Sequence, residues 1–391
     1  MKKIAILVPS LSDGGAEKVA ANLSIIYEEL GYEVYFILYE NRVSFDYEGQ
    51  IIDLNIKARY GLKKIFKDYE IYRKLKSIKR KYKFDFVISH LPKTDLMNCL
   101  TKGNEKVITT IHNNIDVDYP TYMKRMLKYI IRKSDLIASV SRVGEEYLLE
   151  KYSAKNVKTI YNPQILKDIK VKSKLEITEF SNSNFECEII ANVGRLSMQK
   201  GQWHLIRAFS EILKTRPNAK LVIIGRGDLE ERLKILVEKL GIEKNVIFTG
   251  FNSNPYKFLS RTDLYVSTSI HEGLPMTYIE AMSLGIPIIS TDCISGPREI
   301  IAPNKFGEVM DYDEIQEYGV LVSDFASIDT IDSLVISSEE INLANRINSL
   351  LDNKEVYKSL SEKVKQRSYD FDYTNIKKIW ERELNILGGE N

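Results

Sequence analysis

Two glutamates and the residues between them carry the most chemical information in this chain. The stretch HEGLPMTYIE, residues 271–280, places Glu272 and Glu280 on either side of Gly273 and Pro275. It follows the apolar run LYVSTS and precedes IPIIST, and Pro275 suits the start of a helix, so we predict strand, loop, helix and strand. Glu272 then lies at the carboxyl end of a strand, the edge where parallel sheets bind ligands. Carboxylates at these places suit the hydroxyls of a sugar or a ribose.

A pair of cations is predicted to lie in an equivalent loop upstream. The stretch NVGRLSMQKG, residues 192–201, follows an apolar run and precedes a helical pattern with apolar residues on one face. Arg195 and Lys200 therefore fall between a strand and a helix. The planar fork of an arginine and the compact charge of a lysine both suit phosphate oxygens. The alternative is that both residues are solvated surface cations.

These two motifs, GRLxxxKG and then EGLPxxxxE, resemble those of the family-4 retaining glycosyltransferases of GT-B fold. The resemblance covers most of the chain and is strongest from about residue 188 to residue 301. It implies an α/β protein with two doubly wound, Rossmann-like domains that face a cleft, and a C-terminal helix that crosses back to the first domain. The motif GPREII, residues 296–301, resembles members that build capsule, O-antigen or other lipid-linked glycans in bacteria.

The resemblance implies a role for each of these residues. Arg195 and Lys200 would stabilise the diphosphate that leaves a nucleotide sugar, which makes them catalytic candidates. Glu272 would hold hydroxyls of the transferred sugar near the reacting centre, and Glu280 would hold the ribose, unless it is simply an exposed helical glutamate. The N–H groups at the start of that helix could also bind the diphosphate, and they belong to Gly273 and Leu274.

Five further residues are candidates for the donor site. Gly14 and Gly15 separate the first strand from its helix, where a phosphate could reach bare N–H groups, although a tight turn would also use glycine. His112 ends the run VITTIH, where family members carry a histidine that faces the donor sugar. His90 ends a similar run but matches the family less well, and either histidine could be structural. Phe251 lies where the family contacts the base, or it is a packing aromatic.

The length of the chain and its alternating strand and helix patterns favour two domains. A chain of 391 residues exceeds what one core usually holds. We predict an acceptor-binding domain over residues 1–180, a nucleotide-sugar-binding domain over residues 181–373, and the returning helix over residues 374–391. The polar stretch 168–185 is the predicted linker.

Composition excludes several classes of protein. No apolar run is long enough for a membrane-spanning helix. The three scattered cysteines favour neither a disulfide framework nor a zinc site, and they suit a reducing cytosol. We expect no Asp-x-Asp triplet at the end of a strand, so the predicted reaction needs no metal and no other cofactor.

Basic residues are concentrated in the first half of the chain. Residues 1–185 contain 32 Lys+Arg against 23 Asp+Glu, a net charge of +9, whereas the remainder carries −7. Residues 57–83 and 122–133 combine many basic residues with apolar residues at helical spacing. Such helices either lie on an anionic membrane or pack on a sheet with their lysines in solvent. We expect peripheral attachment to the cytoplasmic face of the plasma membrane.

The sequence thus predicts a retaining, metal-independent glycosyltransferase. It would move a hexose or N-acetylhexosamine from a nucleotide sugar, more often UDP- than GDP-linked in this family, to a polyprenyl-diphosphate-linked glycan. Two alternatives stay open. The first is a nucleotide-sugar 2-epimerase of the same fold, and the second is a nucleic-acid-binding protein. In the basic half the tyrosines fall on the apolar stripe, which favours helix packing over stacking on bases, so we expect no nucleic-acid partner.

Overall fold

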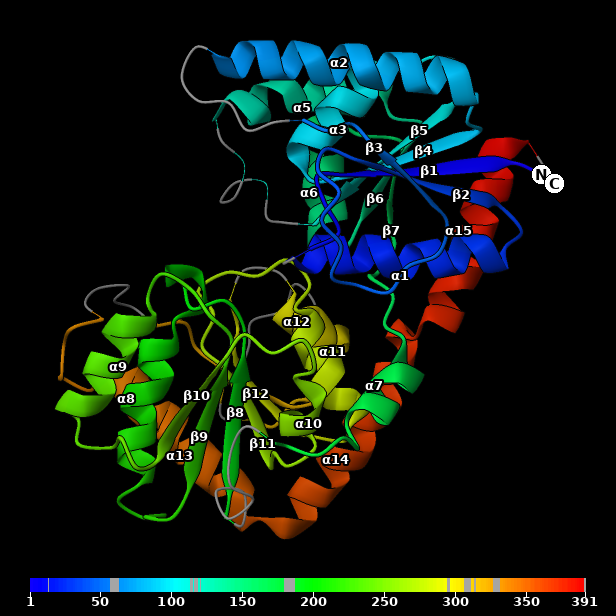
Figure 1. Ribbon diagram of the computed structural model, residues 1–391. Helices are drawn as coiled ribbons and strands as arrows, with labels where there is room; N and C mark the ends of the chain where they lie inside the picture. The colour runs from blue at the N-terminus through cyan, green and yellow to red at the C-terminus, as the bar shows by residue number, and fades with distance from the viewer. Residues whose placement is uncertain are drawn as a thin grey trace. The chain divides into compact units, whose positions relative to one another are not determined.

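The protein consists of two compact units, each built on one parallel sheet (Figure 1). Unit 1 comprises residues 1–164 and 371–391, and unit 2 comprises residues 165–370. The structure is a computed structural model that describes residues 1–12, 14–56, 63–112, 115, 119, 121–178, 187–293, 296–305, 311–312, 314–325 and 331–389. The predicted alternation of strands and helices in two series is confirmed.

Unit 1 holds a seven-stranded parallel sheet with the order β3-β2-β1-β4-β5-β6-β7. Its strands are β1 (Lys3–Val8), β2 (Glu33–Leu38), β3 (Gln50–Asp53), β4 (Phe86–His90), β5 (Lys106–Ile111), β6 (Leu136–Ser139) and β7 (Val157–Thr159). The helices of this unit are α1 (Gly15–Glu29), α2 (Lys63–Tyr82), α3 (Pro92–Leu100), α5 (Thr121–Lys133), α6 (Arg142–Tyr152) and α15 (Tyr373–Gly388). The order reverses at β1, so ligands are expected beyond the carboxyl ends of β1 and β4.

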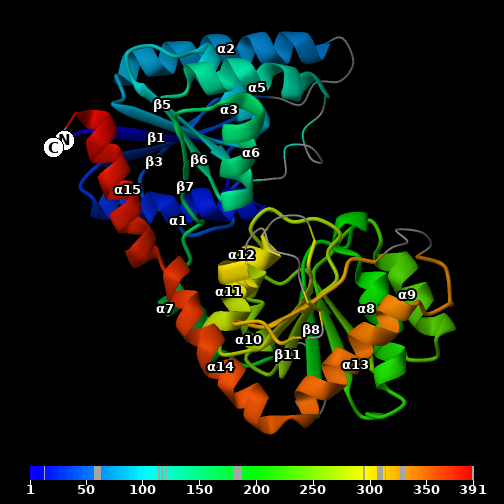
Figure 2. The ribbon, with the colours of Figure 1, turned by 180° about the vertical axis from the view of Figure 1, so that it is seen from behind.

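The C-terminal helix α15 belongs to unit 1, as the sequence predicted. Its apolar face is buried, and the Trp380 ring meets the ring of Tyr27 in α1 edge-on, with the ring centroids 5.5 Å apart. On the solvent side Lys377 forms an ion pair with Glu29, 2.8 Å between Nζ and Oε2. Figure 2 shows α15 running alongside the sheet towards the first residue of the chain. The last helix therefore completes the unit that the first strand begins.

Unit 2 holds a six-stranded parallel sheet with the order β10-β9-β8-β11-β12-β13. Its strands are β8 (Ile189–Val193), β9 (Lys220–Ile224), β10 (Val246–Gly250), β11 (Leu264–Ser267), β12 (Ile288–Thr291) and β13 (Val320–Val322). Its helices are α7 (Leu166–Lys172), α8 (Gln202–Ile212), α9 (Glu230–Lys239), α10 (Tyr256–Leu259), α11 (Met276–Ser283), α12 (Pro297–Ile301), α13 (Ser338–Asp352) and α14 (Lys354–Ser368). The order reverses at β8, which lies between β9 and β11.

The observed division of the chain differs from the predicted boundary at residue 180. The segment that begins the predicted linker folds as helix α7 within unit 2, where it contacts α10 and α11. Leu166 and Ile169 bury their side chains, and Asn254 donates a hydrogen bond to the carbonyl of Lys172, 2.8 Å away. Two apolar residues in a polar stretch were therefore enough to anchor a short helix. The rest of the predicted linker, residues 179–186, lies outside the described residues.

A buried charged network joins α8 to α13 in unit 2. The Glu340 carboxylate accepts hydrogen bonds from Arg207, 2.8 Å from Nε to Oε1, and lies 2.6 Å from Nδ1 of His204. Its other oxygen accepts the N–H of Ser337 at the start of α13, 2.9 Å away. Burial alone would raise the pKa of Glu340, but these hydrogen bonds lower it below its usual value. The charges are buried but fully paired, which is the condition under which a core tolerates them.

Candidate active site

Lys200 and Glu272 meet at the carboxyl edge of the unit 2 sheet. Lys200 Nζ and Glu272 Oε1 are 2.6 Å apart, although the residues belong to loops after different strands, β8 and β11. Glu272 is 5% exposed, and Ser269 Oγ also donates to its Oε1 at 2.6 Å. The interpretation of Lys200 as a solvated surface cation is therefore wrong, because its ammonium lies on a buried carboxylate. The pair stands at the point where the strand order reverses.

Gly201 explains how the Lys200 loop can lie against β11. Its φ is +58°, in the left-handed region, and a Cβ at this position would collide with the carbonyl oxygen of Thr268. Thr268 Oγ1 in turn donates to the carbonyl of Gly201, 2.9 Å away, and the N–H of Ile270 donates to the carbonyl of Gln199, 2.8 Å away. The glycine of the KG pair is thus a packing requirement that brings Lys200 to Glu272.

Arg195 lies at the same edge with its side chain exposed. Within the described part of the chain, this guanidinium has neither a hydrogen bond nor an ion pair. Its backbone is held in place, because Gln202 Nε2 donates to the Arg195 carbonyl at 3.0 Å. The backbone of Arg195 is therefore fixed, while its guanidinium is available to bind an anion.

The loop that leads into α11 offers unused N–H groups beside this pair. No acceptor among the described residues contacts the N–H of Gly273 or Leu274. Gly296 packs against this loop. Its φ is +72°, and the absence of a side chain leaves room for the carbonyl of Gly273. Unused donors just before the start of a helix can bind an anion that the helix end also attracts, so this loop can act together with Lys200.

Glu280 is a buried residue of α11 and not the exposed helical glutamate that remained an alternative. Its side chain is 4% exposed, and Tyr256 OH donates to its Oε1 at 3.3 Å. Burying a carboxylate costs desolvation free energy unless polar groups hydrogen-bond to it. Hydroxyl groups of a ligand can serve as such hydrogen-bond donors. The predicted helix is present, but Pro275 is its N-cap in an extended conformation and not a residue of its first turn.

Phe251 lies at the carboxyl edge just after β10 and is 53% exposed, so it is not a packing aromatic of the core. The Arg226 guanidinium lies over its ring, 5.0 Å from the centroid. Sequence reasoning missed Arg226. The signal was available, because Arg226 comes two residues after β9 in the run VIIGRGD, the same strand-end position as Arg195 after β8. An exposed arginine on an exposed aromatic face is suited to a planar ligand.

In unit 1, Gly14 and Gly15 lie where β1 leads into α1. Neither residue has a positive φ, so the turn by itself does not require glycine. A Cβ on Gly15 would meet nothing within 4 Å, and one on Gly14 would meet only the flexible carboxylate of Glu17. Neither a positive φ nor core packing therefore requires glycine here, although Gly14 is the N-cap of α1, a position where glycine is common. The open space around Gly15 leaves room for a ligand close to the helix start.

His90 and His112 form a pair at the carboxyl ends of β4 and β5. His90 Nδ1 and His112 Nε2 are 2.8 Å apart, which is a hydrogen-bond distance. His90 is fully buried, whereas His112, directly after β5, is half-buried. Sequence reasoning ranked His90 below His112 as a ligand contact, and the structure brings the two together because β4 and β5 are neighbours in the sheet.

The hydrogen bond between the two rings determines which nitrogen of His112 carries its proton. His90 Nε2 is buried and has no partner among the described residues. A buried N–H without an acceptor costs more than a bare lone pair, so we assign the proton of His90 to Nδ1. His90 then donates to His112 Nε2, which leaves the proton of neutral His112 on Nδ1. His90 is thus a positioning residue for His112.

The buried histidines predict that acid weakens the fold. Burial, with a contribution from His112, holds the pKa of His90 well below its usual value, and burial lowers the pKa of His112 to about 4. The pKa of His204 is lowered by burial as well, against the raising effect of Glu340. In the unfolded chain these rings take up a proton near pH ~6.5, whereas in the folded chain they stay neutral. Below that pH the free energy of unfolding therefore falls by about 1.4 kcal/mol per pH unit for each ring that stays neutral.

We therefore expect the melting temperature to fall between pH 7 and pH 5. Scanning calorimetry at several pH values measures this fall. The variant His90→Asn/His112→Asn should show a weaker pH dependence than the wild type over the same range. Equal melting temperatures for the wild type at pH 7 and pH 5 would contradict the argument.

Comparison with known proteins decides the family. A family model of group 1 glycosyl transferases matches residues 173–328, and one of Glycosyltransferase Family 4 matches residues 13–164. An uncharacterized glycosyltransferase of Methanocaldococcus jannaschii is 31% identical over 378 residues, which cover 91% of this chain and 93% of that protein. The chain is a family-4 glycosyltransferase. Each family model falls within one unit, so both units of the glycosyltransferase are those of the family.

A second relative of this glycosyltransferase comes from Campylobacter jejuni. It is 30% identical over 329 residues, covering 80% of this chain and 87% of that protein. It is named N-acetylgalactosamine-N,N'-diacetylbacillosaminyl-diphospho-undecaprenol 4-alpha-N-acetylgalactosaminyltransferase. Both relatives match over most of their length, so the similarity is not limited to one domain.

Solved structures establish the fold of the glycosyltransferase. HepE of Anabaena, solved in complex with UDP and glucose, superimposes with a TM-score of 0.75 over 99% of this chain and 100% of that one, at 18% identity. A sucrose-phosphate synthase of Thermosynechococcus elongatus gives a TM-score of 0.76 over the whole of both chains, also at 18% identity. The expected GT-B fold is thereby confirmed.

Proposed function

We propose that this glycosyltransferase moves a hexose or N-acetylhexosamine from a UDP-sugar to a polyprenyl-diphosphate-linked glycan, with retention of configuration and without a metal. The observation that carries the proposal is the Lys200–Glu272 pair beside the unused N–H groups of Gly273 and Leu274. One small region of unit 2 then offers a cation and two dipolar donors for a diphosphate, and a carboxylate for sugar hydroxyls. Arg195 adds a second cation with an unoccupied fork.

The proposed mechanism is electrostatic. As the glycosidic bond breaks, negative charge grows on the departing diphosphate, and donors aimed at that charge lower the barrier. Lys200 has to release part of its contact with Glu272 to reach the phosphate. Glu272 then exchanges its ammonium partner for sugar hydroxyls. Glu280 would hold the ribose and Phe251, with Arg226 on its ring, would contact the base.

In unit 1 the proposal assigns Gly14 and Gly15 to a donor phosphate and His112 to the sugar. His112 would present its Nδ1–H to an oxygen of the substrate, since Nε2 is occupied by His90. Because the pKa of His112 is lowered to about 4, this ring stays neutral at physiological pH and acts as a hydrogen-bond donor without a charge.

Calorimetric titration of UDP, GDP and ADP in the presence of EDTA tests the donor site. We expect micromolar binding of UDP by the wild type and a loss of about tenfold or more in Lys200→Ala, because a charge-assisted contact contributes about 1.5–3 kcal/mol. Tight binding of another nucleotide would correct the base. Binding that appears only after a divalent metal is added would refute metal independence, and no binding at all would remove the proposal.

Two product assays complete the test of the reaction. The anomeric configuration of the product, read by NMR, distinguishes retention from inversion. Incubation of UDP-N-acetylglucosamine without acceptor addresses the alternative 2-epimerase, which would release free UDP together with a rearranged sugar. A glycosyltransferase releases UDP at full rate only when the acceptor is present.

The proposed acceptor follows from the relatives and not from the site. The Campylobacter relative is named for a substrate linked to diphospho-undecaprenol, and a 34% identical relative over 44% of the chain is named as a lipopolysaccharide 1,6-galactosyltransferase of Salmonella typhimurium. We therefore place the enzyme in the synthesis of bacterial surface polysaccharide, such as capsule or O-antigen.

A lipid-linked acceptor favours peripheral attachment to the inner face of the plasma membrane. No helix among the described residues has the length and apolar content needed to span a membrane. Helices α2 and α5 lie side by side in both views of unit 1 (Figures 1 and 2). Most of their apolar residues pack into the core, in agreement with the interpretation that these helices pack on the sheet. However, Phe66, Tyr69 and Tyr122 are at least 60% exposed. Aromatic residues among lysines suit a membrane interface.

We expect the wild type to float with liposomes that contain anionic lipid at low salt. The variant Phe66→Ser/Tyr122→Ser should float much less, because each aromatic ring inserted into the interface contributes of the order of 1–2 kcal/mol. The matched control is Leu100→Ser/Leu149→Ser, which removes two exposed apolar residues elsewhere in unit 1. Equal flotation of both variants would exclude this face, and no flotation of the wild type would exclude attachment.

A further inference from the structure

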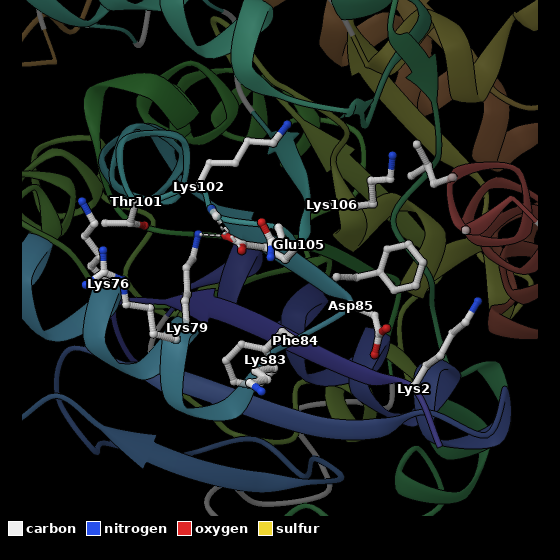
Figure 3. A pocket seen from close by; sticks show the side chains of 16 residues that line it. Lys2, Lys76, Lys79, Lys83, Phe84, Asp85, Thr101, Lys102, Glu105 and Lys106 are labelled. Atoms are coloured by element: carbon white, nitrogen blue, oxygen red, sulfur yellow. Dashed lines mark hydrogen bonds and ion pairs between the residues drawn. The ribbon is translucent and has the colours of Figure 1, made fainter.

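A pocket of about 850 Å³ opens at the amino-terminal edge of the unit 1 sheet. Its walls come from the residues that begin β1, β4 and β5, from the end of α2 and from the last turn of α15 (Figure 3). Gly14, Gly15 and His112 belong to the opposite, carboxyl-terminal edge of the same sheet. The pocket is therefore separate from the candidate donor site, and its volume falls within the usual range for small-ligand sites.

The lining of this pocket is strongly basic. Seven of its sixteen residues are lysine or arginine, and two are acidic, Asp85 and Glu105. Both carboxylates already accept hydrogen bonds from groups of the protein. Asp85 Oδ2 accepts the backbone N–H of Lys3 at 2.7 Å, and Glu105 Oε1 lies 2.8 Å from Lys79 Nζ. The two carboxylates offset two of the seven positive charges, so the lining keeps an excess of positive charge.

Lys79 and Glu105 form the floor of the pocket. Lys79 is 5% exposed, and its ammonium also donates to Oδ1 and to the carbonyl of Asn98, at 2.7 and 3.0 Å. Figure 3 shows the two side chains meeting at the centre, with lysines around them. A buried pair with complete hydrogen bonding gives the pocket a rigid, polar base.

The rim holds cations that the protein leaves uncompensated. Arg80, Lys83 and Lys106 are exposed, and none of their side chains has a hydrogen-bond or ion-pair partner in the part of the chain that the structure describes. Lys83 adopts φ +51° after the last turn of α2, a conformation that favours glycine or asparagine at the end of a helix. Like charges gathered in a concave surface repel one another and concentrate the field that attracts an anion.

We propose that this basic pocket binds a phosphate-bearing anion that carries at least two negative charges. The fork of Arg80 and the ammonium groups of Lys83 and Lys106 match the oxygens of a diphosphate or of a phosphomonoester. The same chemistry is offered by free diphosphate in solution and by the phosphate of a lipid headgroup. The proposal stands independently of the function assigned to the donor site.

Calorimetric titration with inorganic pyrophosphate tests the pocket. All variants carry Arg195→Ala/Lys200→Ala, so that the candidate donor site does not contribute. The pocket variant adds Lys83→Glu/Lys106→Glu. The matched control adds Lys155→Glu/Lys158→Glu, which changes the net charge equally at one exposed loop residue and one exposed strand residue of unit 1. Equal melting temperatures ensure that folding does not account for any difference.

We expect the parent and the control to bind one pyrophosphate per chain, and the pocket variant to bind it at least about tenfold more weakly, with an affinity that falls as salt rises. Flotation with vesicles of phosphatidic acid in phosphatidylcholine, compared with phosphatidylcholine alone, forms the second arm. Flotation without pyrophosphate binding, lost only in the pocket variant, would assign the phosphate to a lipid headgroup. The proposal is overturned if the pocket variant equals the control in both arms, or if the parent binds neither probe.

Discussion

Replacing Lys200 by methionine is expected to lower the rate of glycosyl transfer by about 10²–10³-fold, the usual effect of removing one donor that stabilises charge in a transition state. Methionine keeps the length of the side chain and removes the charge. Glu272, at 5% exposure, would lose its ammonium partner but keep the hydrogen bond from Ser269. The loop should therefore hold its place while the leaving diphosphate loses a cation.

The rate should fall further than the affinity for the intact UDP-sugar. Full charge on the diphosphate exists only as the bond breaks, so Lys200 contributes more to the transition state than to binding of the intact donor. Rates of UDP release from a reactive donor and acceptor pair measure the first effect, and calorimetric affinities for the intact UDP-sugar, titrated without acceptor, measure the second. Lys200→Arg should restore part of the rate, because it restores the charge with a different geometry.

The control for this variant is Lys214→Met. Lys214 pairs with Glu211 at 2.6 Å as Lys200 does with Glu272, but its side chain is 68% exposed and Lys214 lies just past the carboxyl end of α8. It should leave the rate unchanged. If Lys200→Met retained a rate within about threefold of the wild type, the electrostatic mechanism we propose would be wrong, since one such donor normally contributes ~2.7–4 kcal/mol.

Replacing Arg207 by methionine is expected to destabilise unit 2 by about 3–5 kcal/mol, the usual cost of leaving one member of a buried ion pair alone. Arg207 is 3% exposed and Glu340 is 0% exposed, so water cannot take over the missing hydrogen bonds. His204 would remain beside the carboxylate, 2.6 Å away, but as a ring whose pKa is lowered by burial.

Scanning calorimetry measures this loss as a drop of roughly 10 °C in the melting temperature of unit 2, at ~2–4 °C per kcal/mol for a domain of this size. Arg232→Met is the matched control, because Arg232 and Asp332 form an exposed pair, with side chains 46% and 63% exposed. Exposed pairs contribute about 0–1 kcal/mol. Similar melting temperatures for the two variants would mean that the buried network contributes no more than a surface pair.

The site in unit 2 could be predicted because the ends of its strands can be recognised from the sequence. An apolar run followed by glycine, a charged residue and a helical pattern places Arg195, Lys200 and Glu272 at the carboxyl edge of a sheet without knowledge of which strands are neighbours. The helix before Gly285 and the returning helix α15 follow from periodicity in the same way. Local patterns determine these elements because each depends on residues close together in the chain.

Other features depend on contacts between distant parts of the chain. The linker boundary was misplaced because Leu166 and Ile169 find their partners on α10 and α11, far along the sequence. Arg226 gains a role only beside Phe251, which follows the next strand, β10. The His90–His112 hydrogen bond requires β4 and β5 to be adjacent, which no local pattern specifies.

The sequence by itself determined the family, the two doubly wound sheets and the residues that stand at their carboxyl edges, because strand and helix periods and the glycine-flanked motifs are local. Only the tertiary structure decided the ion pair of Lys200 with Glu272, the burial of Glu280, the orientation of His112 and the basic pocket at the far edge of unit 1. The distances between these side chains and their burial depend on the tertiary structure. They arise only when the strand order brings separate loops together and excludes water from them.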